Sequence, residues 1–439
     1  MSELLARKVA LHSIGCRTNQ EELEALSVGL QAAGFCITED LTSADIVIVN
    51  TCSVTSFTES KTRRFLNGLS RSAPQAKLLI TGCFAQQKGA ILKENPQVKW
   101  IVGNGEKQRI VSILKSELSG CFLSDVTSLH TLPADTGVGD PISSGRTRFS
   151  LKIQEGCDFR CAYCIVPALR GKSRSAPSVD LNENFRRAVD AGFKEIVITG
   201  THIGQYRNAE GSKHLVELLE SFFKNDGDYR IRLSSLDPRD LSDDLISLMT
   251  SEAKLCPHLH ISIQSFSPDV LKAMKRPYSD LESLMGRIES FRNLMPTAGL
   301  GADFIVGFPG ETELMFELTL QRVQKLGFTY GHVFRFSKRP GTEASQMSEQ
   351  VSESEKSRRS EMLRSTLLNS RVNFLCSLSG KPLRIIVEKE HPVRGTTDNF
   401  IKVEIPGIRA GRNTWLTVFV ENKTQGGHCL AGIANGETL

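Results

Sequence analysis

One short run carries three cysteines at C-x3-C-x2-C spacing, Gly156-Cys157-Asp158-Phe159-Arg160-Cys161-Ala162-Tyr163-Cys164, just after the strand-like residues 149–153. A loop that turns tightly after a strand brings three thiolates onto one small inorganic centre. Structural zinc sites and electron-transfer clusters usually take four protein ligands. An iron–sulfur cubane held by three thiolates instead leaves one iron open for a substrate. We therefore favour such a cubane, and call these three cysteines the loop triad.

A zinc knuckle is the alternative explanation of the same three cysteines. It requires a fourth ligand from elsewhere in the chain, for which the candidates are Cys256, His260 and Cys429. Zinc sites usually take their ligands from two spaced pairs rather than from one triplet. The iron–sulfur interpretation is therefore preferred.

Length and composition predict a multidomain protein of the cytoplasm. A chain of 439 residues exceeds what one compact core usually holds, so we expect two or three domains. The net charge of +5 permits a nucleic-acid partner without requiring one. Eleven cysteines without a secretory signal indicate metal or redox chemistry rather than disulfides. No stretch approaches the roughly 18 apolar residues of a membrane span, so we expect no membrane partner. We also expect a monomer.

The first third of the chain repeats an apolar strand, a tight turn and a helix three times, with strands at residues 9–14, 46–50 and 77–80. This alternation is typical of an open parallel α/β sheet. A cysteine stands just past the carboxyl end of each strand, at the edge where such sheets place their ligands. One such cysteine alone is more often an inert buried thiol, but three in register predict a second cluster. We call them the N-terminal triad: Cys16, Cys52 and Cys83.

A stretch rich in Ser, Thr, Gly, Pro and Asp at residues 124–147 is predicted to be a linker. A long strand–helix alternation follows it. The predicted strands are residues 149–153, 195–199, 229–234, 258–263, 301–306 and 331–336, and the predicted helices are residues 181–191, 215–223, 241–251, 270–274, 281–294 and 313–326. Six units fall short of the eight of a complete (β/α)8 barrel. We therefore expect a partial (β/α)6 barrel, with its active site at the carboxyl ends of the strands.

Polar residues at those carboxyl ends are candidate ligand contacts. We call them the strand-end residues: Gly200, His202, Ser234, Gln264 and Asp303. Glycines there allow a ligand to approach the backbone closely, although turn chemistry alone also explains the glycine runs. His260 is interpreted as a satisfied barrel histidine.

The end of the chain changes from helical to strand periodicity. Residues 352–371 are charged and compatible with a helix. Their charges are explained slightly better by a helix face exposed to solvent than by a surface that binds RNA. Beyond them, residues 383–388, 400–405 and 416–420 alternate like strands with glycine turns between them. Such a tail suggests a small all-β barrel of the oligonucleotide-binding type, or one that merely braces the rest of the chain.

In this order the parts resemble the radical S-adenosylmethionine (SAM) methylthiotransferases over almost the full chain. The motifs that carry the resemblance are Gly15-Cys16-Arg17-Thr18-Asn19-Gln20, Val49-Asn50-Thr51-Cys52, Gly82-Cys83-Phe84-Ala85-Gln86 and the run that holds the loop triad. The resemblance implies a methylthiotransferase domain at residues 1–123, the linker at 124–147, a radical-SAM core at 148–375 and a TRAM domain at 376–439.

The resemblance also implies the cofactors. Family members bind SAM and two [4Fe–4S] clusters, one on each cysteine triad. The loop triad would hold the cluster that cleaves SAM, the N-terminal triad would hold the cluster that delivers sulfur, and the strand-end residues would contact SAM. Replacing an inert aromatic C–H bond near neutral pH needs a radical, since no side-chain base deprotonates it. A donor such as flavodoxin or ferredoxin would supply the electron.

Three further motifs are similar to the branch that acts on threonylcarbamoyl-adenosine at position 37 of tRNA. They are Gly103-Asn104-Gly105-Glu106-Lys107, Arg232-Leu233-Ser234-Ser235-Leu236-Asp237-Pro238 and His332-Val333-Phe334-Arg335-Phe336-Ser337-Lys338-Arg339-Pro340-Gly341-Thr342. The alternatives are the same chemistry on isopentenyl-adenosine 37 of tRNA or on a ribosomal-protein aspartate. An RNA-binding protein with structural or redox-sensing clusters is the alternative from another class.

The carboxylate of threonylcarbamoyl-adenosine predicts a cation in the site, since an unpaired carboxylate is costly to bury. The candidates near the mouth of the predicted barrel are Arg170, Lys172, Arg335 and Arg339. Arg335 is the most suggestive. In a strand over residues 331–336 it shares a face with Val333 and lies opposite His332. Which of these two faces looks into the barrel stays open at this point.

Overall fold

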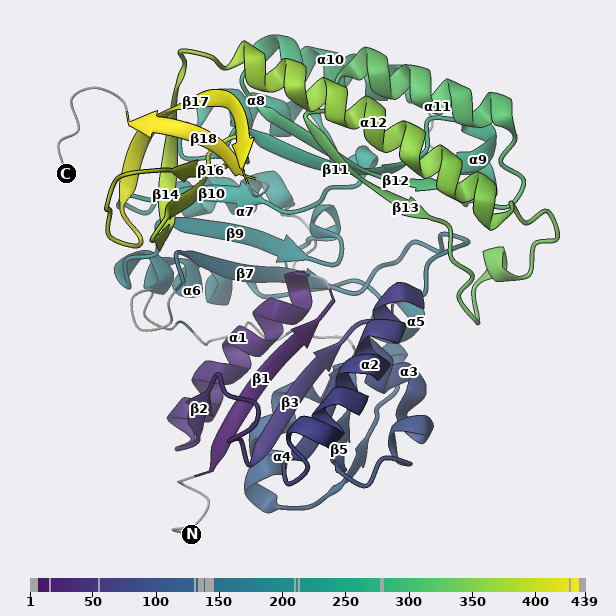
Figure 1. Cartoon of the computed structure of the whole chain (residues 1–439), viewed down its shortest axis with the longest axis vertical. Helices are drawn as coiled ribbons and strands as arrows, with labels where there is room; N and C mark the ends of the chain where they lie inside the picture. Colours follow the sequence, from purple (N-terminus) through teal and green to yellow (C-terminus); the bar gives the residue numbers. More distant parts are fainter. Residues whose placement is uncertain are drawn as a thin grey trace. The chain divides into compact units, whose positions relative to one another are not determined.

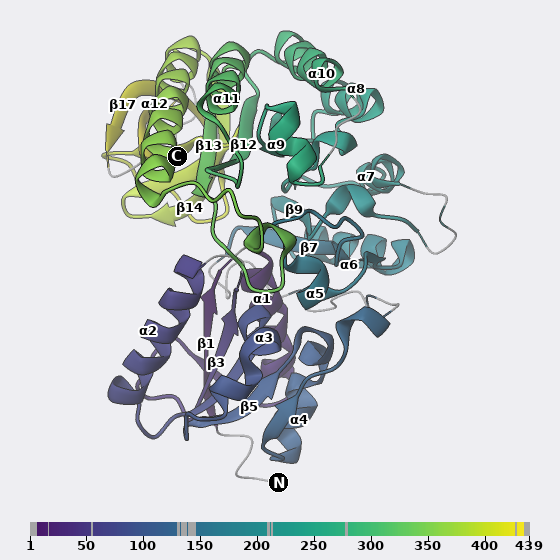
Figure 2. The same cartoon turned by 90° about the vertical axis from the view of Figure 1, so that its right-hand side faces the viewer.

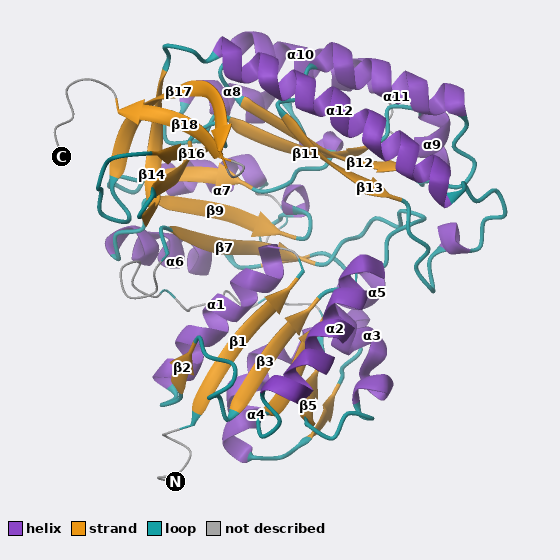
Figure 3. Ribbon diagram, viewed as in Figure 1, coloured by secondary structure: helices purple, strands orange, loops and turns teal. Residues whose placement is uncertain are grey.

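The structure is a computed structural model, and it describes residues 7–15, 17–53, 56–129, 132, 138, 146–208, 211, 214–276, 280–425 and 428–433. The chain divides into two compact units. The first is Met1–Val138, Lys152–Pro177 and Ser337–Ser345, and the second is Gly139–Leu151, Ser178–Phe336 and Gln346–Leu439. Figure 1 and Figure 2 label their elements from two directions, and Figure 3 separates helices, strands and loops by colour.

A parallel six-stranded sheet, in the order β2-β1-β3-β4-β5-β6, forms the centre of the first unit (Figure 1). The strands are β1 (Lys8–Ile14), β2 (Cys36–Thr38), β3 (Ile46–Thr51), β4 (Lys77–Gly82), β5 (Val98–Val102) and β6 (Gly120–Phe122). The helices are α1 (Arg17–Ala32), α2 (Ser56–Ser72), α3 (Cys83–Leu92) and α4 (Ile110–Ser116). The open parallel α/β sheet predicted for this part of the chain is confirmed.

The central strand β3 shows why this sheet is covered on both faces. Val47 packs in a cluster with Leu66 of α2, whereas Ile48 packs in a second cluster with Leu30 of α1. Neighbouring side chains of a strand point to opposite faces. An apolar run without alternation is therefore what a strand between two helical layers requires.

The second unit holds most of a half-barrel of parallel strands. The strands are β7 (Arg148–Glu155), β9 (Glu195–Gly200), β10 (Arg230–Leu233), β11 (His258–Gln264), β12 (Gly299–Val306) and β13 (Tyr330–Arg335). The helices are α6 (Ser178–Asp190), α7 (Leu215–Phe223), α8 (Asp243–Ser251), α9 (Pro268–Ala273), α10 (Leu281–Leu294), α11 (Glu313–Leu326) and α12 (Glu353–Ser377).

Two sheets make up the half-barrel, with the strand orders β10-β9-β7-β8 and β11-β12-β13. Isolated parallel bridges join Ile231 to Leu255 and Leu236 to Ile261, and so continue the series from β10 to β11. Each of the six predicted strands corresponds to one of these parallel strands, which confirms the partial (β/α)6 barrel. Short elements of the first unit follow β7, namely α5 (Val166–Arg170) and β8 (Arg174–Ser175).

The C-terminal strands close into a five-stranded barrel in the order β14-β15-β16-β18-β17. They are β14 (Pro382–Glu390), β15 (Val393–Thr397), β16 (Lys402–Ile405), β17 (Trp415–Gln425) and β18 (His428–Ile433). The predicted small β-barrel is confirmed, but β15 and β18 have no predicted counterpart. In β15 the reason is Gly395, where an added Cβ would lie 2.3 Å from the carbonyl oxygen of Ile386. Close pairing of β15 with β14 requires a glycine at this position. In the sequence, however, a glycine weakens the pattern by which a strand is predicted, so β15 was not expected.

Most of the predicted linker at residues 124–147 lies outside the described residues. Val126 and Leu132, which the structure does describe, are both buried. Among the helices in the described part of the chain, none combines the length and apolar character needed to cross a bilayer.

Candidate active site

The N-terminal triad is positioned by the register of three neighbouring strands. The last residue of β1 pairs with the last residue of β3, which pairs in turn with the last residue of β4. Cys52 and Cys83 directly follow β3 and β4, so they lie at the same edge of the sheet, and both side chains are buried. Cys16, the third member, lies outside the described residues.

Two glycines bring the strand ends close to these cysteines. A Cβ added to Gly15 (φ +138°) would lie 2.3 Å from the Cβ of Cys52 and 3.3 Å from its Sγ. A Cβ added to Gly82 (φ +94°) would lie 2.2 Å from the carbonyl oxygen of Thr51. Only glycine fits both the backbone angle and the space at these positions. The end of β1 therefore lies directly against Cys52.

Cys83 also contacts the segment that follows the loop triad. Its side chain packs with Ile165 and Leu169. Nδ2 of Asn104 donates a hydrogen bond to the carbonyl oxygen of Leu169 (2.7 Å) and lies 3.7 Å from the Sγ of Cys83. The two cysteine-bearing segments therefore share packing inside the first unit.

The loop triad occupies a tight turn between β7 and α5. The amide of Cys157 donates to the carbonyl of Gly171 (3.1 Å), and the amide of Cys164 donates to the carbonyl of Cys161 (3.0 Å). A Cβ on Gly156 would lie 1.9 Å from the carbonyl oxygen of Lys172, so this turn requires glycine. The three cysteines are half-buried. Three soft sulfur donors on one constrained, partly open turn fit an iron–sulfur cluster with one accessible iron.

The candidate fourth ligands for a zinc knuckle each have their own surroundings in the second unit. Cys256 is buried, and burial raises the pKa of its thiol to about 11. Cys429 lies in the core of the C-terminal barrel. His260 lies within hydrogen-bonding distance of Tyr330 and Asp303. The burial and the hydrogen bonds of these three side chains are therefore accounted for without a zinc ion.

Arg170 lies in a buried ion network of the first unit. Its Nη1 donates to Glu22 (3.0 Å) and to Glu155 (2.8 Å), and its Nη2 donates to the side-chain oxygen of Asn19 (3.1 Å). Burial raises the pKa of Glu22, but Arg170 and two neighbouring lysines outweigh burial and hold that pKa well below its ordinary value. The guanidinium of Arg170 is thus already bonded to two carboxylates of the protein.

Arg339 is similarly engaged. It is buried, its Nη2 donates to the carbonyl of Ser53 (2.6 Å), and it forms an ion pair with Glu59. Arg170 and Arg339 are therefore both buried and bonded to carboxylates of the protein.

The strand-end residues differ in what they offer a ligand. Oγ of Ser234 is buried without a hydrogen-bond partner among the described residues. A buried hydroxyl of this kind is costly unless it is paired, so it suits a polar atom of a bound cofactor. Gln264 ends β11 in the left-handed region (φ +72°), a conformation that is rare for a residue other than glycine and is enriched at functional sites. His202 instead lies 2.6 Å from Asp240, and Gly200 ends β9.

The structure decides which face of β13 looks inward. Val333 is buried on the side of α12, and a Cβ on Gly331 would lie 2.8 Å from Leu367 of that helix. Arg335 shares this outward face, and its Nη1 donates to Ser357 of α12 (3.1 Å). In Figure 1, α11 and α12 cover this side of the sheet. His332 points the opposite way, toward the concave side.

Histidine, tyrosine and aspartate side chains form a cluster on the concave side of the half-barrel, and the sequence did not predict it. The ring nitrogens of His260 and His332 each lie 3.0 Å from Oδ1 of Asp303, and Oη of Tyr330 lies 2.9 Å from His260 and 2.7 Å from His258. Burial raises the pKa of Asp303, but the two histidines outweigh it and hold that pKa far below its ordinary value. The signal in the sequence was the period-two placement of these rings in two strands.

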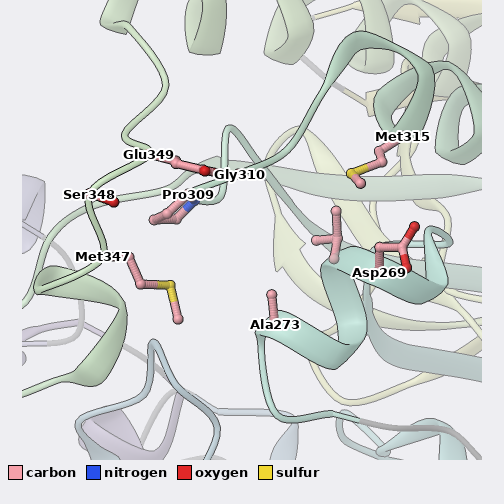
Figure 4. A pocket seen from close by; sticks show the side chains of 9 residues that line it. Asp269, Ala273, Pro309, Gly310, Met315, Met347, Ser348 and Glu349 are labelled. Carbon is pink, nitrogen blue, oxygen red and sulfur yellow. The ribbon is translucent and has the colours of Figure 1, made fainter.

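A separate cavity of about 390 Å³ lies beside the loop after β12 (Figure 4). Its lining includes Ala273, Pro309, Gly310, Met315 and Met347. No strand-end residue lines it, so it does not coincide with the candidate cofactor contacts.

Two family models match the chain. The model described as uncharacterized protein family UPF0004 matches residues 8–103, and the model of the radical SAM superfamily matches residues 151–323. The first match covers β1 to β5 of the sheet that carries the N-terminal triad, and the second covers the loop triad and most of the half-barrel.

Solved structures support the same architecture. The radical S-adenosylmethionine methyltransferase TsrM from Kitasatospora setae superposes with a TM-score of 0.58 over 77% of this chain and 75% of its own, at 14% identity. At that identity the similarity concerns the fold alone.

Known proteins similar in sequence span nearly the whole chain. Threonylcarbamoyladenosine tRNA methylthiotransferase MtaB of Thermotoga maritima is 37% identical over 92% of this chain and 93% of its own, and MtaB of Bacillus subtilis is 33% identical over 91% and 90%. The tRNA-2-methylthio-N(6)-dimethylallyladenosine synthase of Carboxydothermus hydrogenoformans is 34% identical over 79% and 80%. Given such identity over nine-tenths of both chains, this chain belongs to the radical-SAM tRNA methylthiotransferase family.

Proposed function

We propose that this chain places a methylthio group on C2 of threonylcarbamoyl-adenosine at position 37 of tRNA. The observation that carries the proposal is the 37% identity to the Thermotoga maritima MtaB over more than nine-tenths of both chains. The enzyme is a SAM-dependent transferase that uses [4Fe–4S] clusters, as its family does.

The proposal assigns one cluster to each triad. Cys157, Cys161 and Cys164 hold the cluster that binds SAM, and Cys16, Cys52 and Cys83 hold the second cluster. When bound, the clusters and SAM supply the carbon radical that removes hydrogen and the sulfur and methyl group that replace it. The tight turns at three glycines support this assignment, because they hold the cysteine segments in fixed positions.

The chain's own residues position the cofactor and keep the site dry. Ser234 offers a hydroxyl that a polar atom of SAM would satisfy, and the left-handed backbone at Gln264 holds the end of β11 in a fixed shape. Gly200 and His202 remain proposed SAM contacts at the end of β9. Asp303 is proposed below to position a histidine instead. Excluding water around these groups strengthens their electrostatic interactions with the reacting atoms.

The proposed domains are residues 1–123, 148–375 and 376–439, with a linker at 124–147 and a TRAM role for the C-terminal barrel. The five strands of the barrel support that role, since five-stranded barrels of the oligonucleotide-binding type bind nucleic acid. The proposed partners are tRNA and a flavodoxin or ferredoxin as the electron donor. We propose a monomer that acts in the cytoplasm, where its tRNA substrate is found.

The second candidate is the same reaction on dimethylallyl-adenosine 37. It is favoured by the 34% identity to the Carboxydothermus hydrogenoformans synthase over about four-fifths of both chains. The two substrates differ in chemistry, because one carries a carboxylate and the other a bare hydrocarbon.

The test uses the full chain, reconstituted anaerobically with iron and sulfide, with SAM and a chemical reductant. Two anticodon stem-loops that differ only at position 37 are supplied, and their nucleosides are analysed by mass spectrometry. We expect a methylthio product from threonylcarbamoyl-adenosine and little or none from dimethylallyl-adenosine. A product from dimethylallyl-adenosine alone would overturn the substrate assignment. The control is a variant with all three cysteines of the loop triad changed to alanine, which should give neither product.

A further inference from the structure

The concave face of β13 leaves two rings open to solvent. The side chain of His332 is 60% exposed, and Phe334 is 44% exposed. They alternate with the buried Val333, so both point away from α12. Their ring centroids lie 6.3 Å apart. The inside of a complete (β/α)8 barrel is filled by packed side chains, whereas here two rings are open to solvent and offer a surface on which a ligand can bind.

His332 is held in place by a chain of hydrogen bonds across three strands. One set of tautomers gives each link of this chain a donor and an acceptor. His258 donates to Tyr330 (2.7 Å), Tyr330 donates to Nδ1 of His260 (2.9 Å), and Nε2 of His260 donates to Asp303 (3.0 Å). Nδ1 of His332 donates to the same oxygen of Asp303 (3.0 Å). This arrangement fixes the ring of the most exposed member of the chain.

Nε2 of His332 has no hydrogen-bond partner within the described part of the chain. With Nδ1 bonded to Asp303, a protonated ring presents Nε2–H outward to an anion, and the carboxylate of Asp303 balances the positive charge. The arginines considered from the sequence do not compete for this role. Arg170 and Arg339 are paired with carboxylates, and Arg335 lies on the α12 side of the strand.

A metal ion is a less suitable explanation of the same cluster. The ligand atoms of His260, Asp303 and His332 lie within 4.8 Å of one another, as a metal site requires. However, one oxygen of Asp303 already lies at hydrogen-bonding distance from both rings, and Tyr330 satisfies the other nitrogen of His260. The hydrogen bonds therefore account for the geometry without a cation.

We propose that His332 and Phe334 recognise the modified adenine of the substrate. Phe334 stacks on the base, and Nε2–H of His332 binds the carboxylate of the threonylcarbamoyl group. Asp303, His260 and Tyr330 are positioning residues that hold His332. This inference rests on the proposed function, since it names how that same site selects its substrate.

The experiment measures the affinity of the reconstituted enzyme, with SAM, for three anticodon stem-loops. Position 37 carries threonylcarbamoyl-adenosine, its methyl ester, or unmodified adenosine. We expect His332→Ala to weaken binding of the threonylcarbamoyl loop about ten- to hundred-fold, as loss of a charge-assisted hydrogen bond predicts. Binding of the unmodified loop should change less than about two-fold, since it lacks the carboxylate. The methyl ester should weaken binding to the parent enzyme but not to His332→Ala.

Two further variants separate charge from structure. His332→Lys retains a cation and should recover part of the preference for the threonylcarbamoyl loop, whereas His332→Gln should not. Phe334→Ala should weaken binding of all three loops by roughly five- to hundred-fold, because stacking does not depend on the carboxylate. Arg335→Ala is the matched control, since it lies on the opposite face of the same strand and should leave all three affinities unchanged. Iron content and melting temperature verify that each variant is folded.

Specific results would overturn the proposal. One is equal weakening of the threonylcarbamoyl and unmodified loops by His332→Ala. Another is tight binding of the methyl ester by the parent enzyme. Zinc, manganese or extra iron that is stoichiometric in the parent and lost in His332→Ala would reassign the cluster to a metal. If the parent methylthiolates the threonylcarbamoyl loop while His332→Ala keeps its preference, recognition by His332 fails and the proposed function stands. If the parent does not act on that loop, the proposed function itself fails.

Discussion

Replacing Glu195 by glutamine should destabilise the second unit strongly. Glu195 is fully buried at the start of β9 and accepts hydrogen bonds from Arg230 (2.6 Å) and from Arg232 (2.9 and 3.0 Å). Arg148 adds a third ion pair at 3.0 Å. The carboxylate thus balances arginines that sit between the half-barrel and the C-terminal barrel.

The same two arginines hold the C-terminal barrel through its backbone. Arg230 donates to the carbonyl of Thr396 (2.9 Å), and Arg232 donates to the carbonyls of Thr397 and Asp398 (both 2.9 Å). These carbonyls lie at and just after the end of β15. Loss of the carboxylate removes the anion that both guanidinium groups bond to directly, and so disturbs this junction.

The expected cost of Glu195→Gln is about 3–5 kcal/mol, the typical penalty for removing one partner of a buried ion pair. For a unit of roughly 250 residues, in which 1 kcal/mol shifts the melting temperature by about 2–4 °C, the expected decrease is about 6–20 °C. Arg232 is as fully buried as Glu195, which makes the loss of its carboxylate partner costly.

The assay follows thermal unfolding by the fluorescence of Trp415, which lies 3.8 Å from the guanidinium of Arg384 in the second unit. Trp100, in the first unit, is replaced by phenylalanine so that only Trp415 reports. Glu183→Gln is the matched control, because Glu183 pairs with Arg186 on an exposed face of α6 and its loss should leave the midpoint unchanged. A midpoint for Glu195→Gln within about 2 °C of the parent would refute the reasoning.

The pH dependence gives a second check on Glu195. Burial raises the pKa of Glu195, but Arg230, Arg232 and Arg148 outweigh burial and hold that pKa well below its ordinary value. A depressed pKa adds stability above the pKa of the unfolded state, about 4.3, and this stability is lost as pH falls through the folded value. The difference between the parent and Glu195→Gln should therefore be full at neutral pH and shrink below about pH 4.

Two other predictions concern the cysteines. Changing all three cysteines of the loop triad to alanine should leave about four irons per reconstituted chain, held by the N-terminal triad, while 5′-deoxyadenosine production is lost. Iron near zero in that variant would show that the N-terminal triad holds no cluster. Iodoacetamide at pH 8 should label Cys36 and Cys376, which are exposed, but not Cys256, because burial raises the pKa of Cys256 to about 11. Peptide mass spectrometry that finds Cys256 labelled as fast as Cys376 would contradict that prediction.

The local pattern of the sequence determined the elements and their class. Apolar runs of four to six residues, followed by glycine turns and helical spacing, predicted all six strands of the half-barrel and the three units of the first sheet. The repeated apolar strands also predicted that Cys52 and Cys83 follow neighbouring strands at one edge of the sheet. These signals are short-range, since each depends on residues within one element or one turn.

Charged side chains show what local pattern does not determine. Residues 352–371 favoured a solvated face, and Arg358 of α12 is indeed exposed, but Arg359 next to it is buried against Glu311 at 2.8 Å. From the sequence, Arg170 is a candidate to bind the substrate carboxylate. In the structure it binds the carboxylate of Glu22, which lies 148 positions away in the sequence. No periodicity within a helix predicts such a partner, because the interaction depends on how distant elements pack.

Only the tertiary structure decided which face of β13 looks inward and which groups meet there. The alternation of Val333, Arg335 and His332 was visible in the sequence, but either face could have been the concave one. Packing of α12 over Val333 fixed the choice. It placed His332 beside Asp303, a residue of the neighbouring strand 29 positions earlier. The side chains of a strand alternate by local geometry, whereas the identity of their neighbours depends on strand order and register, which long-range packing determines.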